Sequence, residues 1–235
     1  LRIDNQKIYP QNDGCGNNYH KNFKFISNWE EKQPRCVFRG SATGCGITPE
    51  TNMRLKAALL SFEMMQKGND SLDAKLTSWN RKPKMYNGVL STINPQDFPK
   101  KMIVDKKKNF MSLEEQSSYK YILNIDGHVK AFRLSNELRM HSVVLLVESP
   151  YTLWFQDKMK AYETYVPVKS DLSDLVKQIE WCQQNDDTCR KIAKNAYDFY
   201  KTYLEKDGMY EWFETLLTNL GRSRIPPVIK QSKQN

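Results

Sequence analysis

The sequence lacks several motifs that would assign a function directly. It contains neither a G-x-G-x-x-G fingerprint nor a G-x-x-x-x-G-K-[ST] loop, which argues against the usual dinucleotide-binding site and against a simple P-loop NTPase. Its longest apolar run, Val143 to Val147, is far too short to cross a membrane. No charged-then-apolar secretory segment opens the chain, and the first residue is not Met, so we expect a processed or excised piece of a longer protein.

Cysteine and histidine are sparse. The five cysteines are an odd number without C-x-x-C spacing, which predicts neither a disulfide framework nor a zinc site. A bridge between Cys36 and Cys45 stays open, because both flank the end of an expected strand. Of the three histidines, only His128 lies near a suspected site, where a solvated or capping role fits its position as well as a ligand role does.

The composition is that of a folded, basic protein. Hydrophobic residues make up 39% and aromatic residues 11%, enough for a packed core. The net charge is +9, with basic clusters at 81–84, 100–101 and 106–108. Such a surface can bind nucleic acid or an anionic membrane, or it can keep the protein in solution and attract an anionic substrate. Nucleic-acid binding is the weaker alternative, because no zinc-finger spacing, RNA-recognition signature or Arg-rich repeat is present.

Strand-like and helix-like segments alternate along most of the chain, as judged by the spacing of apolar residues. Strands are expected at 34–39, 72–77, 119–125, 142–148 and 165–168, with a short one at 102–104. Helices are expected after Thr48, which would cap the first, and at 132–140, 151–160, 170–184, from 186 onward and at 210–220. Ser112 and Glu115 form a capping-box pattern for a short helix, and residues 80–100 are expected to be a loop.

This alternation predicts an α/β fold, a Rossmann-like parallel sheet with helices on both faces. We expect one such domain at residues 34–220. Residues 1–33 are polar and rich in Asn, and would be a connector or the remnant of an upstream domain. Residues 221–235 would be a mobile polar tail.

Two expected strands lead into glycine and polar residues with an arginine close by. Arg39 stands at the end of the first strand, before Gly40 and Ser41, and Arg133 follows the loop that starts at Gly127. Ligands of open α/β sheets bind outside the carboxyl ends of the strands. Two guanidinium groups that converge there match the geometry of phosphate oxygens. The residues therefore predict a pocket for a phosphorylated small molecule, such as a nucleotide-linked one.

An ordered set of sequence blocks resembles a known family. The blocks are F-R-G-S at 38–41, Y-K-Y-I-L-N at 119–124 leading to A-F-R at 131–133, S-V-V-L at 142–145, Y-V-P-V-K-S-D-L at 165–172, and N-D-D at 185–187 followed by I-A at 192–193. In this order they are similar to the C-terminal half of the Rumi-type protein O-glucosyltransferases, a family that includes capsule-associated and lipopolysaccharide-modifying glycosyltransferases. The match extends over about residues 29–220.

The resemblance implies that the chain corresponds to the C-terminal, donor-binding domain of a GT-B glycosyltransferase. The donor would be a nucleotide-sugar, typically UDP-linked, bound with no cofactor and no obligatory metal, in line with the absence of any D-x-D triplet. Arg39, Gly40 and Ser41 match the family's donor-contacting strand end. A donor loop and helix start, offering free backbone N–H groups to phosphate, match the following residues, with the last facing the diphosphate: Gly127, His128, Val129, Lys130, Ala131, Phe132 and Arg133.

The resemblance also implies what the chain does. It would transfer a sugar from the nucleotide-sugar to a protein or glycan hydroxyl. No catalytic residue is assigned, because the family's carboxylate lies well upstream of F-R-G-S and no equivalent is evident among Asp4, Asp13, Glu30 and Glu31. An N-terminal domain or a second copy of the chain would then complete the enzyme. The alternatives are a sugar-nucleotide-binding module without turnover and a basic nucleic-acid-associated protein.

The expected cellular compartment follows from the residue types at two sequence positions. The cysteines that bracket the donor region in secreted relatives are missing, since residue 118 is Ser and residue 140 is Met. Their absence favours a soluble protein in a reducing compartment such as the cytoplasm.

Overall fold

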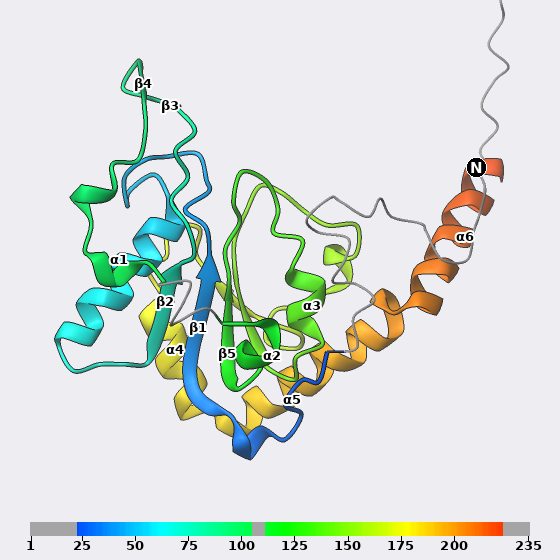
Figure 1. The fold of residues 1–235 in the computed structure, drawn as a ribbon. Coiled ribbons are helices and arrows are strands. Elements are labelled where there is room, and N and C mark those ends of the chain that lie inside the picture. The colour runs from blue at the N-terminus through cyan, green and yellow to red at the C-terminus, as the bar shows by residue number, and fades with distance from the viewer. Residues whose placement is uncertain (1–22, 105–110, 223–235) are drawn as a thin grey trace, which may run out of the picture.

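A parallel sheet forms the centre of the protein. The computed structural model describes residues 23–104 and 111–222 (Figure 1). Five strands lie in the order β2-β1-β5-β6-β7, and every neighbouring pair is parallel. They are β1 (Gln33–Gly40), β2 (Leu72–Leu76), β5 (Tyr119–Asn124), β6 (Val143–Val147) and β7 (Val166–Val168). The Rossmann-like parallel sheet expected from the sequence is confirmed.

Helices cover both faces of this sheet. They are α1 (Met53–Gln66), α2 (Leu113–Gln116), α3 (Leu134–Leu138), α4 (Leu175–Gln184) and α5 (Asp186–Phe199). A further helix, α6 (Lys206–Arg222), follows them in the chain. Short 3-10 turns lie at Trp29–Glu31, Pro95–Asp97, Lys100–Met102 and Gln156–Lys158, and a π-helical turn at Tyr200–Leu204 connects α5 to α6. In Figure 1, α6 extends away from the sheet.

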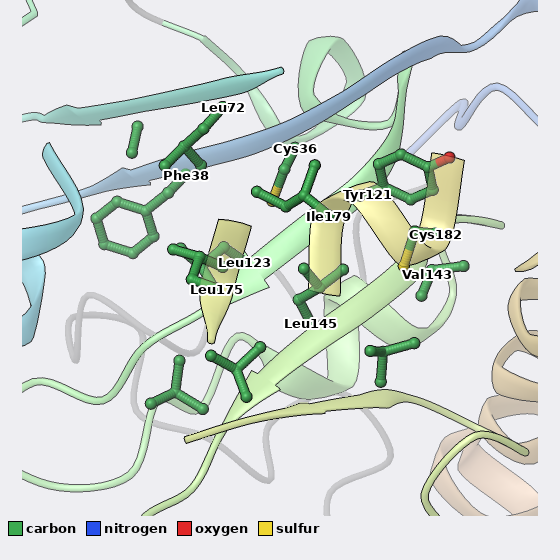
Figure 2. Packing of buried hydrophobic residues seen from close by; sticks show 14 of the residues in the cluster. Cys36, Phe38, Leu72, Tyr121, Leu123, Val143, Leu145, Leu175, Ile179 and Cys182 are labelled. Atoms are coloured by element: carbon green, nitrogen blue, oxygen red, sulfur yellow. The ribbon is translucent and has the colours of Figure 1, made fainter. Parts of the chain in front are cut away.

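The alternation of side chains along the strands builds two apolar layers. On one face, Phe38, Leu123 and Leu145 pack against α1 and α4 (Figure 2). On the other face, Val144 and Leu146 pack against α3 and the end of α5. Burying a side chain of this size stabilises the fold by about 1.5–3 kcal/mol. The two layers therefore hold the strand ends, and the loops that follow them, in defined positions.

Helix α1 begins later than the sequence suggested. Its N-cap is Asn52, whose side-chain oxygen accepts the backbone N–H groups of Arg54 at 3.1 Å and Leu55 at 3.3 Å. The expected cap, Thr48, instead shares a hydroxyl–hydroxyl contact of 3.1 Å with Thr51 in the preceding turn. Asn is among the strongest N-cap residues, because its short side chain reaches back to the free N–H groups.

Three other helices differ in extent from the prediction. Residues 151–160 hold only a 3-10 turn. Phe155 and Met159 are four residues apart, as on one face of a helix, but they reach the core from a loop. Helix α4 begins only after Asp174, since Leu172 has a φ of 60°, which a helix does not accommodate. The helix expected at 132–140 is reduced to α3.

The segment between β2 and β5 is more ordered than a loop. Within 80–100 lies an antiparallel hairpin of β3 (Lys84–Tyr86) and β4 (Val89–Ser91), which stands beyond the carboxyl end of β1 in Figure 1. The strand expected at 102–104 is only a single bridge between Leu76 and Ile103. The capping box of α2 is confirmed, with Ser112 and Glu115 bonding each other's backbone N–H.

Some predictions fall outside the described residues: most of the connector at 1–33, the basic cluster at 106–108, and nearly all of the tail at 221–235. Just before β1, Trp29 packs in the main core and donates its Nε1–H to Asp186 Oδ2 at 2.9 Å. Of the helices in the described part of the chain, none is long and apolar enough to cross a membrane.

Candidate functional site

The candidate site lies at the carboxyl ends of β1 and β5. The loop after β1 and the loop after β5 meet there, because the two strands are direct neighbours in the sheet. Helix α1 begins beside them. This is the edge at which parallel α/β sheets bind ligands, and it is the edge predicted from the sequence.

Arg54, in the first turn of α1, joins the two loops. Its Nη1 donates to the carbonyl oxygen of Ser41 at 3.1 Å and to Thr43 Oγ1 at 2.6 Å, on the β1 side. Its Nε and Nη2 donate to the carbonyl oxygen of Ile125, at 3.2 and 2.8 Å, on the β5 side. These partners are carbonyl and hydroxyl oxygens rather than carboxylates, so they bind the guanidinium without neutralising its charge.

Arg133 comes to the same place from the start of α3. Its Nη1 donates to the carbonyl oxygen of Arg39, and its Nε lies 3.2 Å from Glu137 Oε1. The ring of Phe38 lies beneath both guanidinium groups, with its centroid 4.9 Å from the Cζ of Arg133 and 5.8 Å from that of Arg54. The negative face of the ring favours both cations. Within the described chain, Nη2 of Arg133 has no hydrogen-bond partner.

Two glycines allow the guanidinium groups to approach the backbone this closely. A Cβ on Gly40 would lie 2.8 Å from Phe38 Cζ and 3.1 Å from Arg133 Nη2. A Cβ on Gly127 would lie 2.6 Å from Thr43 Oγ1 and 3.3 Å from an Nη atom of Arg54. A side chain at either glycine would therefore displace the arginines.

Arg39 does not join this pair, contrary to the geometry expected of it. Its side chain points across the face of the sheet, where Nη2 lies 2.6 Å from Asp73 Oδ2 and Nη1 donates to the Asp73 carbonyl oxygen at 2.7 Å. The alternation along β1 explains the difference: Phe38 and Gly40 project to one side, and Arg39 to the other, with Val37. The Arg39 backbone borders the site, and Arg54 supplies the second guanidinium.

The sequence contained one signal for Arg54 that was missed. Arg54 adjoins the apolar face of a predicted helix, next to Leu55 and one turn before Ala58. A charged residue in such a position is buried only when it has partners. Arg54 is 8% exposed and its partners are the two loops.

The remaining residues of the expected donor loop divide into two groups. His128, Val129 and Phe132 are exposed, the last two by 53% each. Lys130 is buried, with its Nζ 3.6 Å from Asp126 Oδ2, and forms no hydrogen bond within the described residues. The expected donor loop therefore combines exposed apolar side chains with one buried cation.

The expectation that a helix start offers free backbone N–H groups to phosphate was wrong. The backbone N–H of Ala131 donates to Asp126 Oδ1 at 2.9 Å, so it is already satisfied. Helix α3 begins three residues later and spans only Leu134–Leu138, too short for a substantial dipole. Side-chain cations, not a helix terminus, make this site attractive to anions.

The charges at the site shift the ionisation of its members. Burial lowers the pKa of Arg54 to about 9, and the nearby charge of Arg133 adds to the decrease. Burial raises the pKa of Glu137, which Arg133 and a hydrogen bond from Asn124 only partly offset. Burial also lowers the pKa of His128, with Lys84 and Lys82 acting in the same direction. The excess positive charge favours an anionic ligand.

Other predicted features can be placed as well. Cys36 is buried and Cys45 exposed, and both are free thiols, so the bridge left open between them does not form. Across the described residues, no group of three or more His, Cys, Asp or Glu side chains is arranged to hold a metal ion.

Together, the fold and the site define a Rossmann-like α/β domain with a cluster of cationic side chains at the carboxyl edge of its sheet. The sequence profile of glycosyl transferase family 90 matches residues 21–232. The chain therefore belongs to glycosyl transferase family 90, as the resemblance of its sequence blocks predicted.

Individual relatives are longer than this chain. Uncharacterized protein 179R of Invertebrate iridescent virus 6 is 41% identical over 212 residues, which are 83% of this chain and 17% of the viral protein. Protein O-glucosyltransferase 1 of Rattus norvegicus is 28% identical over 194 residues, 83% of this chain and 43% of the rat protein. The crystal structure of TarM aligns with 81% of this chain and 37% of its own, with a TM-score of 0.46 and 10% identity.

Proposed function

We propose that the chain is the donor-binding part of a GT-B glycosyltransferase, and that Arg54 and Arg133 bind the diphosphate of a nucleotide-sugar. The observation that carries this proposal is the pair of guanidinium groups above Phe38, at the carboxyl ends of two adjacent strands. Membership of glycosyl transferase family 90 supports sugar transfer as the reaction class. Relatives named protein O-glucosyltransferase support a glucose-type donor and a protein hydroxyl as acceptor.

The role of the arginines in such a reaction is electrostatic. As the bond between the sugar and the diphosphate breaks, negative charge grows on the departing phosphate oxygens. Fixed cations in a partly buried site stabilise that charge more than water does. Nη2 of Arg133 is buried and has no hydrogen-bond partner among the described residues, so an entering phosphate oxygen would become its acceptor. Phe132 and Val129 offer apolar surface to the base or the sugar.

The acceptor side of the reaction needs further groups. An attacking hydroxyl loses its proton, and a carboxylate within hydrogen-bond reach is the usual base. The carboxylates beside the pair, Asp126 and Glu137, are engaged by Ala131, Lys130, Asn124 and Arg133. We therefore assign the base and the acceptor groove to another domain or to a second copy of the chain.

Calorimetric titration with UDP and UDP-sugars tests the donor site. Arg133→Ala should weaken binding by about 1.5–3 kcal/mol, the usual size of a charge-assisted hydrogen bond. Arg54→Lys, which keeps a charge but loses the planar fork, should weaken it as well. Arg190→Ala is the matched control, because Arg190 lies on α5 and pairs with Glu30 far along the surface.

The outcomes are distinct. Weaker binding in both site variants, with unchanged binding in the control, supports the proposal. Absence of any heat or thermal shift with millimolar UDP in the folded wild-type chain would contradict the proposal. Equal affinities in all variants would show that the phosphates bind elsewhere on the protein.

A further inference from the structure

The tip of the β3–β4 hairpin is an exposed apolar surface. Met85, Val89 and Leu90 are 65%, 63% and 67% exposed, and Tyr86 is 36% exposed. The hairpin stands beyond the rest of the fold in Figure 1. Four exposed apolar side chains on one projecting tip are unusual for a surface that faces only water.

The tip is apolar on both of its faces. In the hairpin register, Met85 pairs with Leu90 and Tyr86 pairs with Val89. Because successive strand residues point to opposite sides, one pair lies on each face. A groove on a partner protein would cover one face and leave the other in water. An apolar medium that surrounds the tip covers both.

The base of the hairpin is positively charged, and its own segment of the sequence holds no acidic residue. Arg81 and Lys82 are exposed, and Lys84 lies at the start of β3. Residues 77–96 contain no Asp or Glu. The cations therefore form a collar behind the apolar tip, complementary in charge to an anionic surface.

The hairpin is held in a defined orientation. Lys84 Nζ donates to the carbonyl oxygen of Gly46 at 2.7 Å, and the side chain of Asn80 lies 2.8 Å from His128 Nε2. The turn of Asn87 and Gly88, with φ values of 50° and 79°, is of the type that matches strand twist. An isolated hairpin of this length is marginal, so these contacts with both loops of the candidate site fix its direction.

We propose that the hairpin docks the protein on an anionic lipid bilayer, with its tip inserted among the headgroups. At about 3.3 Å per residue, the three residues of each strand reach roughly 10 Å, which matches the depth at which interfacial segments bind. The cationic collar then lies at the level of the anionic headgroups, where each cation adds about fivefold to the affinity. The candidate site, tied to the hairpin base, faces the membrane. This inference does not depend on the proposed function.

Co-sedimentation of the full chain with vesicles tests the docking. Binding should be stronger to phosphatidylcholine vesicles containing phosphatidylserine than to phosphatidylcholine alone, and should decrease with salt. The double variant Met85→Ser and Leu90→Ser should lose about tenfold or more in affinity for the anionic vesicles, because it removes the apolar contribution. Leu217→Ser is the control, since Leu217 of α6 is an exposed leucine, at 53%, that lies away from the hairpin.

A spectroscopic readout separates insertion from adsorption by net charge. The fluorescence of Tyr86→Trp, after subtraction of the wild-type spectrum, should shift to shorter wavelength when anionic vesicles are added. Supporting results are this shift together with selective loss of binding in the tip variant. The proposal is overturned if the chain does not bind anionic vesicles at low salt, if the tip variant binds like the wild type, or if the new Trp stays in water.

Discussion

At the scale of the residue, the glycines of the site set how closely the arginines approach the backbone. Gly127→Ala would place a methyl group 2.6 Å from Thr43 Oγ1 and 3.3 Å from Arg54. The hydrogen bonds of Arg54 to both loops would then have to shift, so we expect a stability loss of about 1–3 kcal/mol and weaker UDP binding. Chemical denaturation and calorimetry measure the two effects.

The control for this substitution is Gly221→Ala. Gly221 lies in α6, and a Cβ there would meet nothing within 4 Å. Alanine in a helix is more stable than glycine by about 0.5–1 kcal/mol, so the control should be neutral or slightly stabilising. Equal effects at the two positions would show that Gly127 has no special packing role.

Another single residue, Lys32, predicts a pH dependence of stability. Its Nζ is buried and donates to the carbonyl oxygens of Ser117 and Met140 and to Ser142 Oγ. Burial lowers its pKa from 10.5 to about 7. The unfolded chain then binds more protons between these values, so the free energy of unfolding should rise with pH from about 7 toward 10.5, by at most about 1.4 kcal/mol per pH unit.

Lys32→Met isolates this contribution. The difference in unfolding free energy between wild type and variant, measured with urea at several pH values, should grow in favour of the wild type as the pH rises above 7. A flat difference would mean that the three acceptors keep the ammonium protonated throughout.

The arginines also show what could and could not be predicted from the sequence. The site edge and Arg133 followed from strand ends and sequence blocks, and the structure brings Arg133 to that edge. The expectation that the guanidinium group of Arg39 converges with that of Arg133 was wrong. It rested on the position of Arg39 in the chain and not on the side of β1 to which its side chain points. Its neighbour Asp73 lies on another strand, so the ion pair that holds it could only be seen once the strand pairing was known.

At the scale of the element, the position of the first helix depends on one cap. Asn52 is buried, accepts two backbone N–H groups of α1, and donates to the carbonyl oxygen of Gly46 at 3.1 Å. Asn52→Ala should destabilise the protein by about 1–2 kcal/mol, at the upper part of the range for N-caps. Thr48→Ala, at the cap expected from the sequence, should cost less, and thermal unfolding of the two variants decides between them.

Elements with strong local signals were predicted well. The buried strands β1, β5 and β6 and the capping box of α2 follow from apolar runs and from two short-range contacts. The failures came where tertiary contacts outweigh spacing. Phe155 and Met159 imitate a helical period while lying in a loop, and the hairpin within 80–100 has strands of only three residues.

At the scale of the whole molecule, the proposed division of labour predicts binding without turnover. The chain supplies cations for the donor, while its site carboxylates are engaged. We expect UDP release from UDP-sugars to stay far below ~1 per second, the low end of ordinary enzyme rates, with or without peptide or glycan acceptors. Turnover at that rate would place a base within this chain or in a dimer of it, and a dimer would appear in light scattering.

The hydrogen bonds of Arg54 have a consequence for the rates at which a ligand associates and dissociates. The carbonyl oxygens of Ser41 and Ile125 are joined by one guanidinium before any ligand arrives. For the anion binding proposed above, the two loops would thus already be in place, and little conformational entropy would be lost on binding. The proposed association would then be governed by diffusion in the positive field of the arginines, and selectivity between anions would reside in how slowly each one dissociates.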